Sequence, residues 1–309
     1  MSPLHQRLAD YLAIRRAMGF KMERHEKLLA QFVDYLTVND AGTVTLEDAL
    51  AWATSPTTSD PRWWAARLSM VRGFAVHLHA LDPAHQVPPP GLIRHRTRRT
   101  VPHLYTDDEV TALVRAAGQL PGSPLRAATY QTLVRLLAVT GMRVGEAIRL
   151  DRQDWDGGLG LLTVRHTKFG KSRQLPMHPT STAGLQDYLD LRDHLLPHAH
   201  TDALLLSTQG FRLRYNRVSD TFHRLLGPSG VTPRPSATRP RIHDLRHTFA
   251  VASLLDWYRN GADVPAMLPR LSTYLGHADP KHTYWYLSAA PELLALAADR
   301  LDAHLEGPQ

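Results

Sequence analysis

Apolar residues recur at helical spacing through the first eighty positions of the chain. The pattern is clear in residues 4–12, 28–36, 46–52 and 64–78, with three to four apolar side chains on one face every two turns. Residues typical of helix starts precede two of these stretches. They are Thr45, which forms an approximate capping box with Asp48, and the Asp-Pro pair at 60–61. Four helices of this length suffice for a small bundle. The pattern therefore predicts an all-helical N-terminal domain.

Beyond residue 103 the pattern mixes two periods. Residues 160–167 and 172–177 alternate in the manner of strands around a short turn, which predicts a β-hairpin. A further short strand is expected at 203–207. Helices are expected after a capping box formed by Thr106 and Glu109, over 124–140, 179–196 and 215–226, and in several stretches from 242 onward. The expected fold class is α+β, mostly helical with a small antiparallel sheet.

A proline-rich, basic segment separates the two patterns. Residues 83–103 carry four arginines and no acidic residue, and they show no apolar periodicity. We interpret them as a linker between residues 1–82 and residues 104–309. The linker is either a solvated tether or a strap along a phosphate backbone, where each arginine would release counterions. Its arginines are Arg94, Arg96, Arg98 and Arg99.

Composition excludes several classes of protein. The 309 residues carry 36 basic and 29 acidic side chains, a net charge of +7, and 43% are hydrophobic, which is enough for a sizeable core. The absence of cysteine excludes a disulfide scaffold, a thiolate metal site and a thiol nucleophile. No apolar run approaches the length of a membrane span, and the first twenty residues lack the pattern of a secretory signal. We expect a cytoplasmic protein, and the basic charge suggests nucleic acid as a partner.

Two segments present cations that could reach a phosphate. In residues 140–150, Arg143 stands at the start of a short helix just after a glycine, where helix N–H groups also face outward. In residues 166–177, Lys168 leads into the tight turn of the predicted hairpin. Alone, each segment also fits an ordinary solvated surface, a helical hairpin in the first case and a basic turn in the second.

Two further segments combine histidines, arginine and tyrosine. His243 and Arg246 share a helical face and could hold one phosphate between a proton carrier and a fixed cation. Alternatively, His243 and His247 lie four residues apart and could bind zinc, as in a zinc hydrolase. His277 follows a glycine at a helix end, and Tyr286 comes nine residues later. A tyrosine beside imidazoles and arginines can act as a covalent nucleophile, although a lone tyrosine is usually core packing.

The four segments occur together in one order: G-x-R, a hairpin lysine, H-x-L-R-H, L-G-H and a tyrosine nine residues after the last histidine. This order, with HDLRHTFA and YLGH as its most specific parts, resembles the tyrosine recombinases or phage integrases of the Xer/integrase type. The resemblance covers about residues 104–290. It implies a catalytic recombinase domain, preceded by a SAM-like core-binding domain that contacts DNA.

The resemblance also implies a reaction. The tyrosine attacks a DNA phosphate, giving a 3′-phosphotyrosine and a free 5′-hydroxyl, and another strand's hydroxyl reverses the step without metal, ATP or other cofactor. Arg143 and Arg246 would bind the non-bridging oxygens, Lys168 would protonate the leaving oxygen, His243 would assist proton movement, His277 would hydrogen-bond the phosphate, and Tyr286 would be the nucleophile. Such chemistry serves DNA recombination and integration, including movement of mobile elements.

Other residues are given supporting roles. Glu146, Asp244 and His247 would hold the catalytic groups in place. Lys171 and Arg173 join the linker arginines as candidate DNA contacts. The double-stranded DNA of the recombination site would be the substrate. A final amphipathic helix, with apolar residues from 293 to 305, could pass to a neighbouring subunit and link four protomers on paired sites.

Several alternatives stay open at this stage. Leu287 and Ser288 stand where many relatives have Thr-His, so Tyr284 is a second candidate for the nucleophile. The hairpin register leaves Lys171 as an alternative to Lys168. A type IB topoisomerase or a telomere resolvase would use the same residue set. Two alternatives belong to other functional classes: a zinc hydrolase, and a DNA-binding protein with an inactive site.

Overall fold

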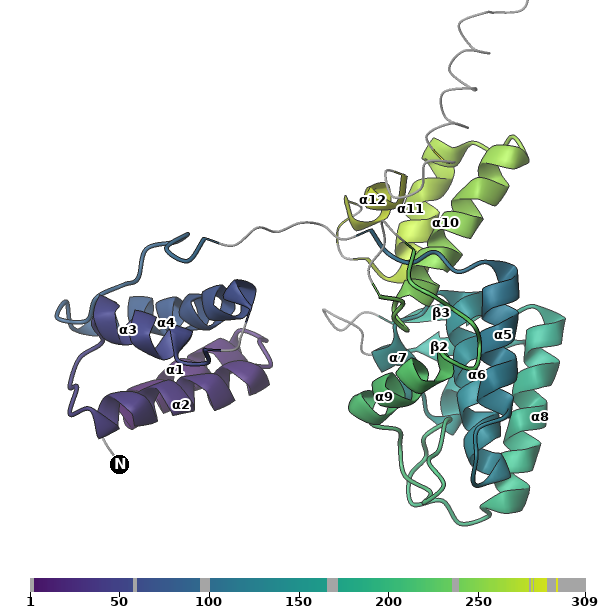
Figure 1. Cartoon of the computed structure of the whole chain (residues 1–309), viewed down its shortest axis with the longest axis horizontal. Helices are drawn as coiled ribbons and strands as arrows, with labels where there is room; N and C mark the ends of the chain where they lie inside the picture. The colour runs from purple at the N-terminus through teal and green to yellow at the C-terminus, as the bar shows by residue number, and fades with distance from the viewer. Residues whose placement is uncertain are drawn as a thin grey trace, which may run out of the picture. The chain divides into compact units, whose positions relative to one another are not determined.

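The computed structural model describes residues 3–57, 60–94, 101–165, 172–234, 239–277, 279, 281–287 and 293. The chain divides into two compact units, Met1–Arg99 and Thr100–Gln309 (Figure 1). No described helix is both long and apolar enough to cross a membrane.

The first unit is a bundle of α-helices, as the apolar spacing predicts. It consists of α1 (Pro3–Ala17), α2 (Glu23–Val38), α3 (Leu46–Thr54) and α4 (Pro61–Leu81). The long helix α4 packs against the other three. Side chains of Phe32 and Phe74 are fully buried between them. Asp60 caps α4 by accepting a hydrogen bond from the backbone N–H of Arg62 at 2.8 Å, so the Asp-Pro start is confirmed.

The second unit is mostly helical and carries one small sheet. Its helices are α5 (Asp107–Gly118), α6 (Pro124–Thr140), α7 (Val144–Arg149), α8 (Pro179–Leu195), α9 (Tyr215–Leu225), α10 (Asp244–Arg259), α11 (Val264–Leu275) and α12 (Lys281–Leu287). Helices α5, α6 and α8 lie side by side (Figure 1). The predicted capping box is confirmed, because Thr106 and Glu109 exchange side-chain-to-backbone hydrogen bonds at the start of α5.

Three short antiparallel strands form the sheet, in the order β1 (Trp155–Asp156), β2 (Leu161–Val164), β3 (Arg173–Pro176). Leu162 pairs with Leu175, and both side chains are completely buried. The predicted hairpin is therefore confirmed in its two strands. Its turn, with Lys168 and Lys171, lies outside the described residues.

The strand expected at 203–207 is wrong. Residues 203–206 make only isolated bridges, Asp151 with Ala203 and Leu206 with Arg212. These residues are apolar because the surrounding core buries them completely, and not because they join a sheet. The two-residue strand β1 is too short to leave a periodic signal in the sequence.

The last described helices form a separate apolar cluster. Residues of α10, α11 and α12 build it together with Leu293, and both α10 and α11 contact α12 (Figure 1). Tyr286 belongs to this cluster with only 2% of its surface exposed. The expected final helix over 293–305 lies outside the described residues, apart from the buried side chain of Leu293.

Candidate active site

Two helices that end at glycine supply the framework of the site. Gly141 follows α6 and Gly276 follows α11, both in the left-handed conformation with φ of 58° and 69°. A Cβ atom at Gly141 would lie 2.4 Å from the ring of Phe249, and one at Gly276 would lie 2.7 Å from the guanidinium of Arg173. Glycine at these points lets the carbonyl groups at both helix ends face buried cations.

Arg246 binds the carbonyls of both helix ends. Its Nη1 donates to the carbonyl of Gly141 at 2.8 Å and its Nη2 donates to that of Leu275 at 2.7 Å. The residue is only 2% exposed. Burial, helped by the charge of Arg143, lowers the pKa of Arg246 to about 10, which leaves the guanidinium protonated at neutral pH. A charge held this firmly is already oriented for a ligand.

Arg143 is the second cation of the site. It precedes α7, and its Nη1 donates to Glu146 at 2.8 Å while its Nη2 donates to the carbonyl of Gly276 at 3.2 Å. About a third of its side chain stays exposed, in contrast to Arg246. Arg143 can therefore meet a ligand that approaches from solvent.

Glu146 anchors two arginines from different elements. Besides Arg143, its carboxylate accepts a hydrogen bond at 2.7 Å from Nη2 of Arg173, whose Nε donates to the carbonyl of Tyr274. Burial alone would raise the pKa of Glu146, but the hydrogen bonds and charges of Arg173 and Arg143 outweigh it and lower the pKa to about 2. The charge of Arg246 also acts on Glu146, so one carboxylate stands among three arginines, which leaves a net positive charge for an anion.

We expect Glu146→Gln to lower the free energy of unfolding at pH 7 by about 3 kcal/mol, the equivalent of moving a carboxyl pKa from 4.5 to about 2. Because the folded-state pKa is the lower one, this stabilisation is complete above pH 4.5 and disappears as the pH falls toward 2. Urea unfolding of both proteins between pH 7 and pH 3 measures it. If the difference in free energy of unfolding between the wild type and Glu146→Gln does not narrow below pH 4.5, the role of these ion pairs is contradicted.

Tyr286 lies against this cationic group. Burial raises the pKa of its hydroxyl, while the positive charges of Arg246 and Arg143 act in the opposite direction. The ring of His277 lies nearly parallel to that of Tyr286, with centroids 6.1 Å apart, and its Nδ1 is 2.8 Å from the hydroxyl of Thr283. Tyr284, on the same short helix, is 53% exposed.

Two histidines complete the group, His243 just before α10 and His247 in its first turns. The rings of His243 and His247 meet edge to face at 5.1 Å, and the ring of His247 is 5.5 Å from that of Tyr286. Burial lowers the pKa of both, that of His247 to about 4, so both are largely neutral at pH 7. His243 can therefore accept a proton. Nδ1 of His247 is buried without a hydrogen-bond partner in the described part of the chain.

Asp244 fixes the turn that carries His243. It is completely buried and forms an ion pair with Arg241 at 2.9 Å, and it also accepts a hydrogen bond from the Arg241 backbone. The hydroxyl of Tyr105 donates to the Arg241 carbonyl from the other side. Asp244 thus acts on the site through the backbone, as a positioning residue.

The structure brings together most of the predicted site. Within one cluster lie Arg143, Glu146, His243, Arg246, His247, His277 and Tyr286. Lys168, Lys171, Arg96, Arg98 and Arg99 lie outside the described residues. Arg94 is exposed in the N-terminal unit. Asp244 contacts Arg241 in the turn before His243, and the guanidinium of Arg173 is hydrogen-bonded to Glu146.

Sequence reasoning missed the contacts that hold the arginines. Arg173 was expected at a DNA surface, yet it binds Glu146, which lies 27 positions earlier in the chain with strands β1 and β2 between them. No spacing rule links two residues so far apart. The glycines of the G-x-R and L-G-H motifs were a partial signal, since both mark helix ends. As for the zinc alternative, the described residues contain no group of three or more histidine, aspartate or glutamate side chains able to hold a metal ion.

A family model decides the family. The model of the phage integrase family matches residues 104–292. The chain belongs to the phage integrase family. The matched residues span the whole cluster just described. The family places the chain among the tyrosine-type site-specific recombinases, enzymes that break and rejoin DNA.

Relatives of full length agree with this placement. The chain is 41% identical to y4rB of Sinorhizobium fredii, a protein named as an integrase/recombinase, over 99% of both chains. It is 30% identical to the tyrosine recombinase XerC of a Mycobacterium species, over 90% of this chain and 91% of that one. The fold is similar to that of phage lambda integrase in a tetramer bound to a Holliday junction, with a TM-score of 0.58, 20% identity and coverage of 92% and 76%.

Proposed function

We propose that this recombinase cuts DNA with the hydroxyl of Tyr286. The Tyr286 oxygen attacks a backbone phosphorus, so the new bond is the tyrosyl O–P bond and the bond that breaks is the one to the 5′-oxygen. The phenol proton passes toward His243, and Lys168 supplies the proton that the departing 5′-oxygen needs. A 5′-hydroxyl from another strand then reverses the step and releases Tyr286.

The observation that carries the proposal is the burial of Tyr286 beside the rings of His247 and His277 and the charge of Arg246. A guanidinium whose charge already acts on the Tyr286 hydroxyl can also bind the phosphate that this hydroxyl attacks. Arg143, with its exposed edge, takes the second non-bridging oxygen, and His277 adds a hydrogen bond. Tyr284, by contrast, is 53% exposed and lies outside this buried cluster.

A nicked suicide duplex tests this function. The recombination site is first selected from random duplexes by affinity for the protein. The selected duplex is then nicked a few nucleotides to the 3′ side of the cleavage point. The short fragment that carries the new 5′-hydroxyl then diffuses away, and religation stops. We expect the wild-type protein to form an SDS-stable DNA adduct in the presence of EDTA. Adduct formation that needs an added metal ion, or relaxation of supercoils without any paired site, would favour the hydrolase or topoisomerase alternatives.

The same proposal extends to domains and assembly. Residues 1–82 and the basic linker 83–103 bind DNA beside the catalytic residues 104–309, with the linker arginines on phosphates. The protein is a monomer in solution and a cyclic tetramer on paired sites, in line with the lambda integrase tetramer on its junction. The final helix passes between neighbouring subunits and couples their tyrosines.

Deletion of residues 290–309 tests this assembly. We expect the truncated protein to bind one half-site with unchanged affinity, because the deleted helix contacts a subunit and not DNA, and to lose pairing of sites and strand exchange. Gel mobility of one-site and two-site complexes measures both. Leu301→Glu alters the apolar face of the helix alone and should reproduce the defect, whereas Asp302→Asn, next to it, should not. Normal recombination by the truncated protein would contradict this assembly, and so would its unfolding, which would show that residues 290–309, with the buried Leu293, stabilise their own subunit.

A further inference from the structure

Tyr105 follows the basic segment 83–103 and lies outside the motifs of the recombinase site. Its side chain is only 4% exposed and belongs to the large apolar core of the catalytic unit. The ring meets that of His103 edge to face, with centroids 4.6 Å apart, and the ring of Phe222 on α9 is 6.4 Å away at nearly a right angle. Aromatic contacts with two other rings fix the ring of Tyr105, and with it the direction of the hydroxyl.

Tyr105 contacts both sides of the turn that carries His243. Its hydroxyl donates a hydrogen bond to the carbonyl of Arg241 at 3.0 Å, and its backbone N–H donates to the hydroxyl oxygen of Thr248 at 2.9 Å. The Arg241 carbonyl also accepts the backbone N–H of Asp244, and the Thr248 hydroxyl donates to the Asp244 carbonyl, each at 3.0 Å. The two hydrogen bonds of Tyr105 therefore reach the chain just before His243 and about one turn after it.

The segment that leads to His243 is attached to the same stretch at a second point. Nη2 of Arg234 lies 3.3 Å from the carboxylate of Glu109, in the first turn of α5. This carboxylate also accepts the backbone N–H of Thr106 at 2.9 Å. Residues 105–109 thus hold the chain before His243 at two points.

Proton transfer depends closely on the position of this turn. A proton acceptor must come within about 2.6–3.2 Å of the oxygen whose proton it takes. Displacement of a reacting group by about 1 Å can cost about 10²-fold in rate. Burial, together with the negative charges of Asp244 and Glu109, raises the pKa of the Tyr105 hydroxyl. This hydroxyl therefore stays protonated near neutral pH and keeps donating to the turn.

We propose that Tyr105 is a positioning residue for DNA cleavage, and that it orients His243 toward the hydroxyl of Tyr286. It acts through the Arg241 carbonyl, to which its hydroxyl is hydrogen-bonded. A phenylalanine ring would fill the same space in the core, so the hydroxyl is the part of the side chain that this role requires. The inference rests on the proposed function, in which His243 takes the phenol proton.

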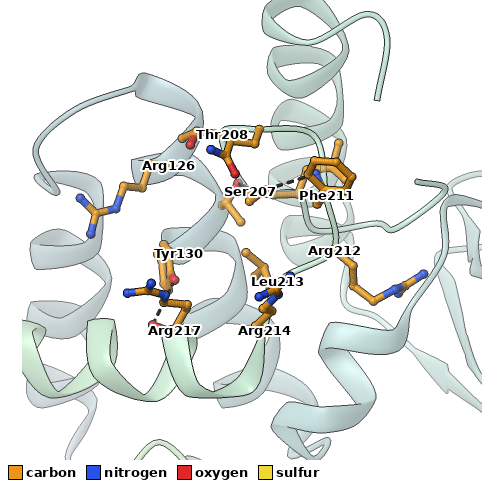
Figure 2. A pocket seen from close by; sticks show the side chains of 12 residues that line it. Arg126, Tyr130, Ser207, Thr208, Phe211, Arg212, Leu213, Arg214 and Arg217 are labelled. Carbon is orange, nitrogen blue, oxygen red and sulfur yellow. Dashed lines mark hydrogen bonds between the residues drawn. The ribbon is translucent and has the colours of Figure 1, made fainter. Parts of the chain in front are cut away.

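A second buried tyrosine of the catalytic unit provides the matched control. Tyr130 on α6 is 7% exposed, belongs to the same apolar core and donates its hydroxyl to the carbonyl of Arg217 on α9 at 3.4 Å. Figure 2 shows both residues among those that line a pocket of about 410 Å³. Tyr130→Phe therefore removes the same group from the same core, but it leaves the turn of His243 untouched.

The experiment measures single-turnover formation of the SDS-stable adduct on the nicked duplex at saturating protein, with the dissociation constant measured separately. We expect Tyr105→Phe to slow the adduct by about 10- to 10²-fold, because the ring of His243 is no longer held in place, and to leave the dissociation constant unchanged. Tyr130→Phe should react at the wild-type rate. Each variant loses one hydrogen bond, so their melting temperatures should fall by similar small amounts.

A double-mutant cycle tests whether Tyr105 acts through His243. His243→Ala should slow the adduct by about 10²–10⁴-fold, the usual contribution of a positioned acid or base. If Tyr105 only orients His243, Tyr105→Phe has no further effect in the His243→Ala background. A contribution to stability alone would lower the rate equally in both backgrounds. Equal losses in the two backgrounds, or an unchanged rate of Tyr105→Phe, overturn the proposal.

Hydrogen exchange of residues 241–246 in the protein without DNA follows the turn itself and does not depend on cleavage. We expect faster exchange in Tyr105→Phe than in the wild type and in Tyr130→Phe, because the Arg241 carbonyl loses its hydroxyl donor. Unchanged exchange overturns the proposal as well. A wild-type protein that forms no adduct would instead contradict the proposed function, and the exchange would still show whether Tyr105 holds the turn.

Discussion

Tyr286→Phe is expected to abolish covalent attachment to DNA and to leave DNA binding nearly unchanged. The substitution removes one oxygen from a ring that stays packed in the cluster of α10, α11 and α12. Without that oxygen no bond to phosphorus can form, whereas the arginines that bind the phosphate remain. The SDS-stable adduct on the nicked duplex should disappear. The dissociation constant of the non-covalent complex should change by no more than about tenfold, because a single neutral hydrogen bond contributes about 0.5–1.5 kcal/mol.

Tyr284→Phe is the matched control, since it removes the same atom from the neighbouring tyrosine of α12. We expect it to form the adduct at the wild-type rate. A Tyr286→Phe protein that still forms the adduct, with Tyr284→Phe inactive, would make Tyr284 the nucleophile. Peptide mapping of the wild-type adduct gives the same answer independently, because the attached nucleotide changes the mass of one tyrosine.

The order of motifs could be read from the sequence because each motif is local. Arg143 next to a helix start, and His243 three residues before Arg246, follow from spacing alone. The helices of both units were predictable for the same reason, since each buries a continuous apolar face. The strand expected at 203–207 was wrong because a short apolar segment that is completely buried in a loop has the same residue pattern as a buried strand.

Contacts between distant segments could not be predicted. The pairing of Glu146 with Arg173 depends on where β3 lies relative to α7, and the sequence does not fix that distance. The same holds for Arg246, whose partners are carbonyls that every residue possesses. Sequence reasoning also could not choose between phosphate and zinc for His243 and His247. In the fold their rings meet edge to face, and that of His247 reaches Tyr286.

Arg143→Ala and Arg246→Ala are each expected to slow DNA cleavage by about 10²–10³-fold or more, the usual cost of removing one oriented donor to a transition-state anion. Negative charge grows on the non-bridging oxygens as Tyr286 attacks, and the hydrogen bonds of each guanidinium already hold it in place to meet that charge. Single-turnover adduct formation on the nicked duplex, at saturating protein, separates this effect from weaker binding. A loss below tenfold would argue against either role.

The two variants differ in what else they disturb. Arg246→Ala also leaves the carbonyls of Gly141 and Leu275 without their donors in the core, so part of its effect can come from lost stability. Arg143→Ala leaves Glu146 still paired with Arg173, and its melting temperature should stay close to that of the wild type. Arg246→Lys keeps the charge but cannot donate to both carbonyls and a phosphate at once. If Arg246→Lys is stable and cleaves at the wild-type rate, charge alone suffices and the fork geometry of Arg246 is not what catalysis requires.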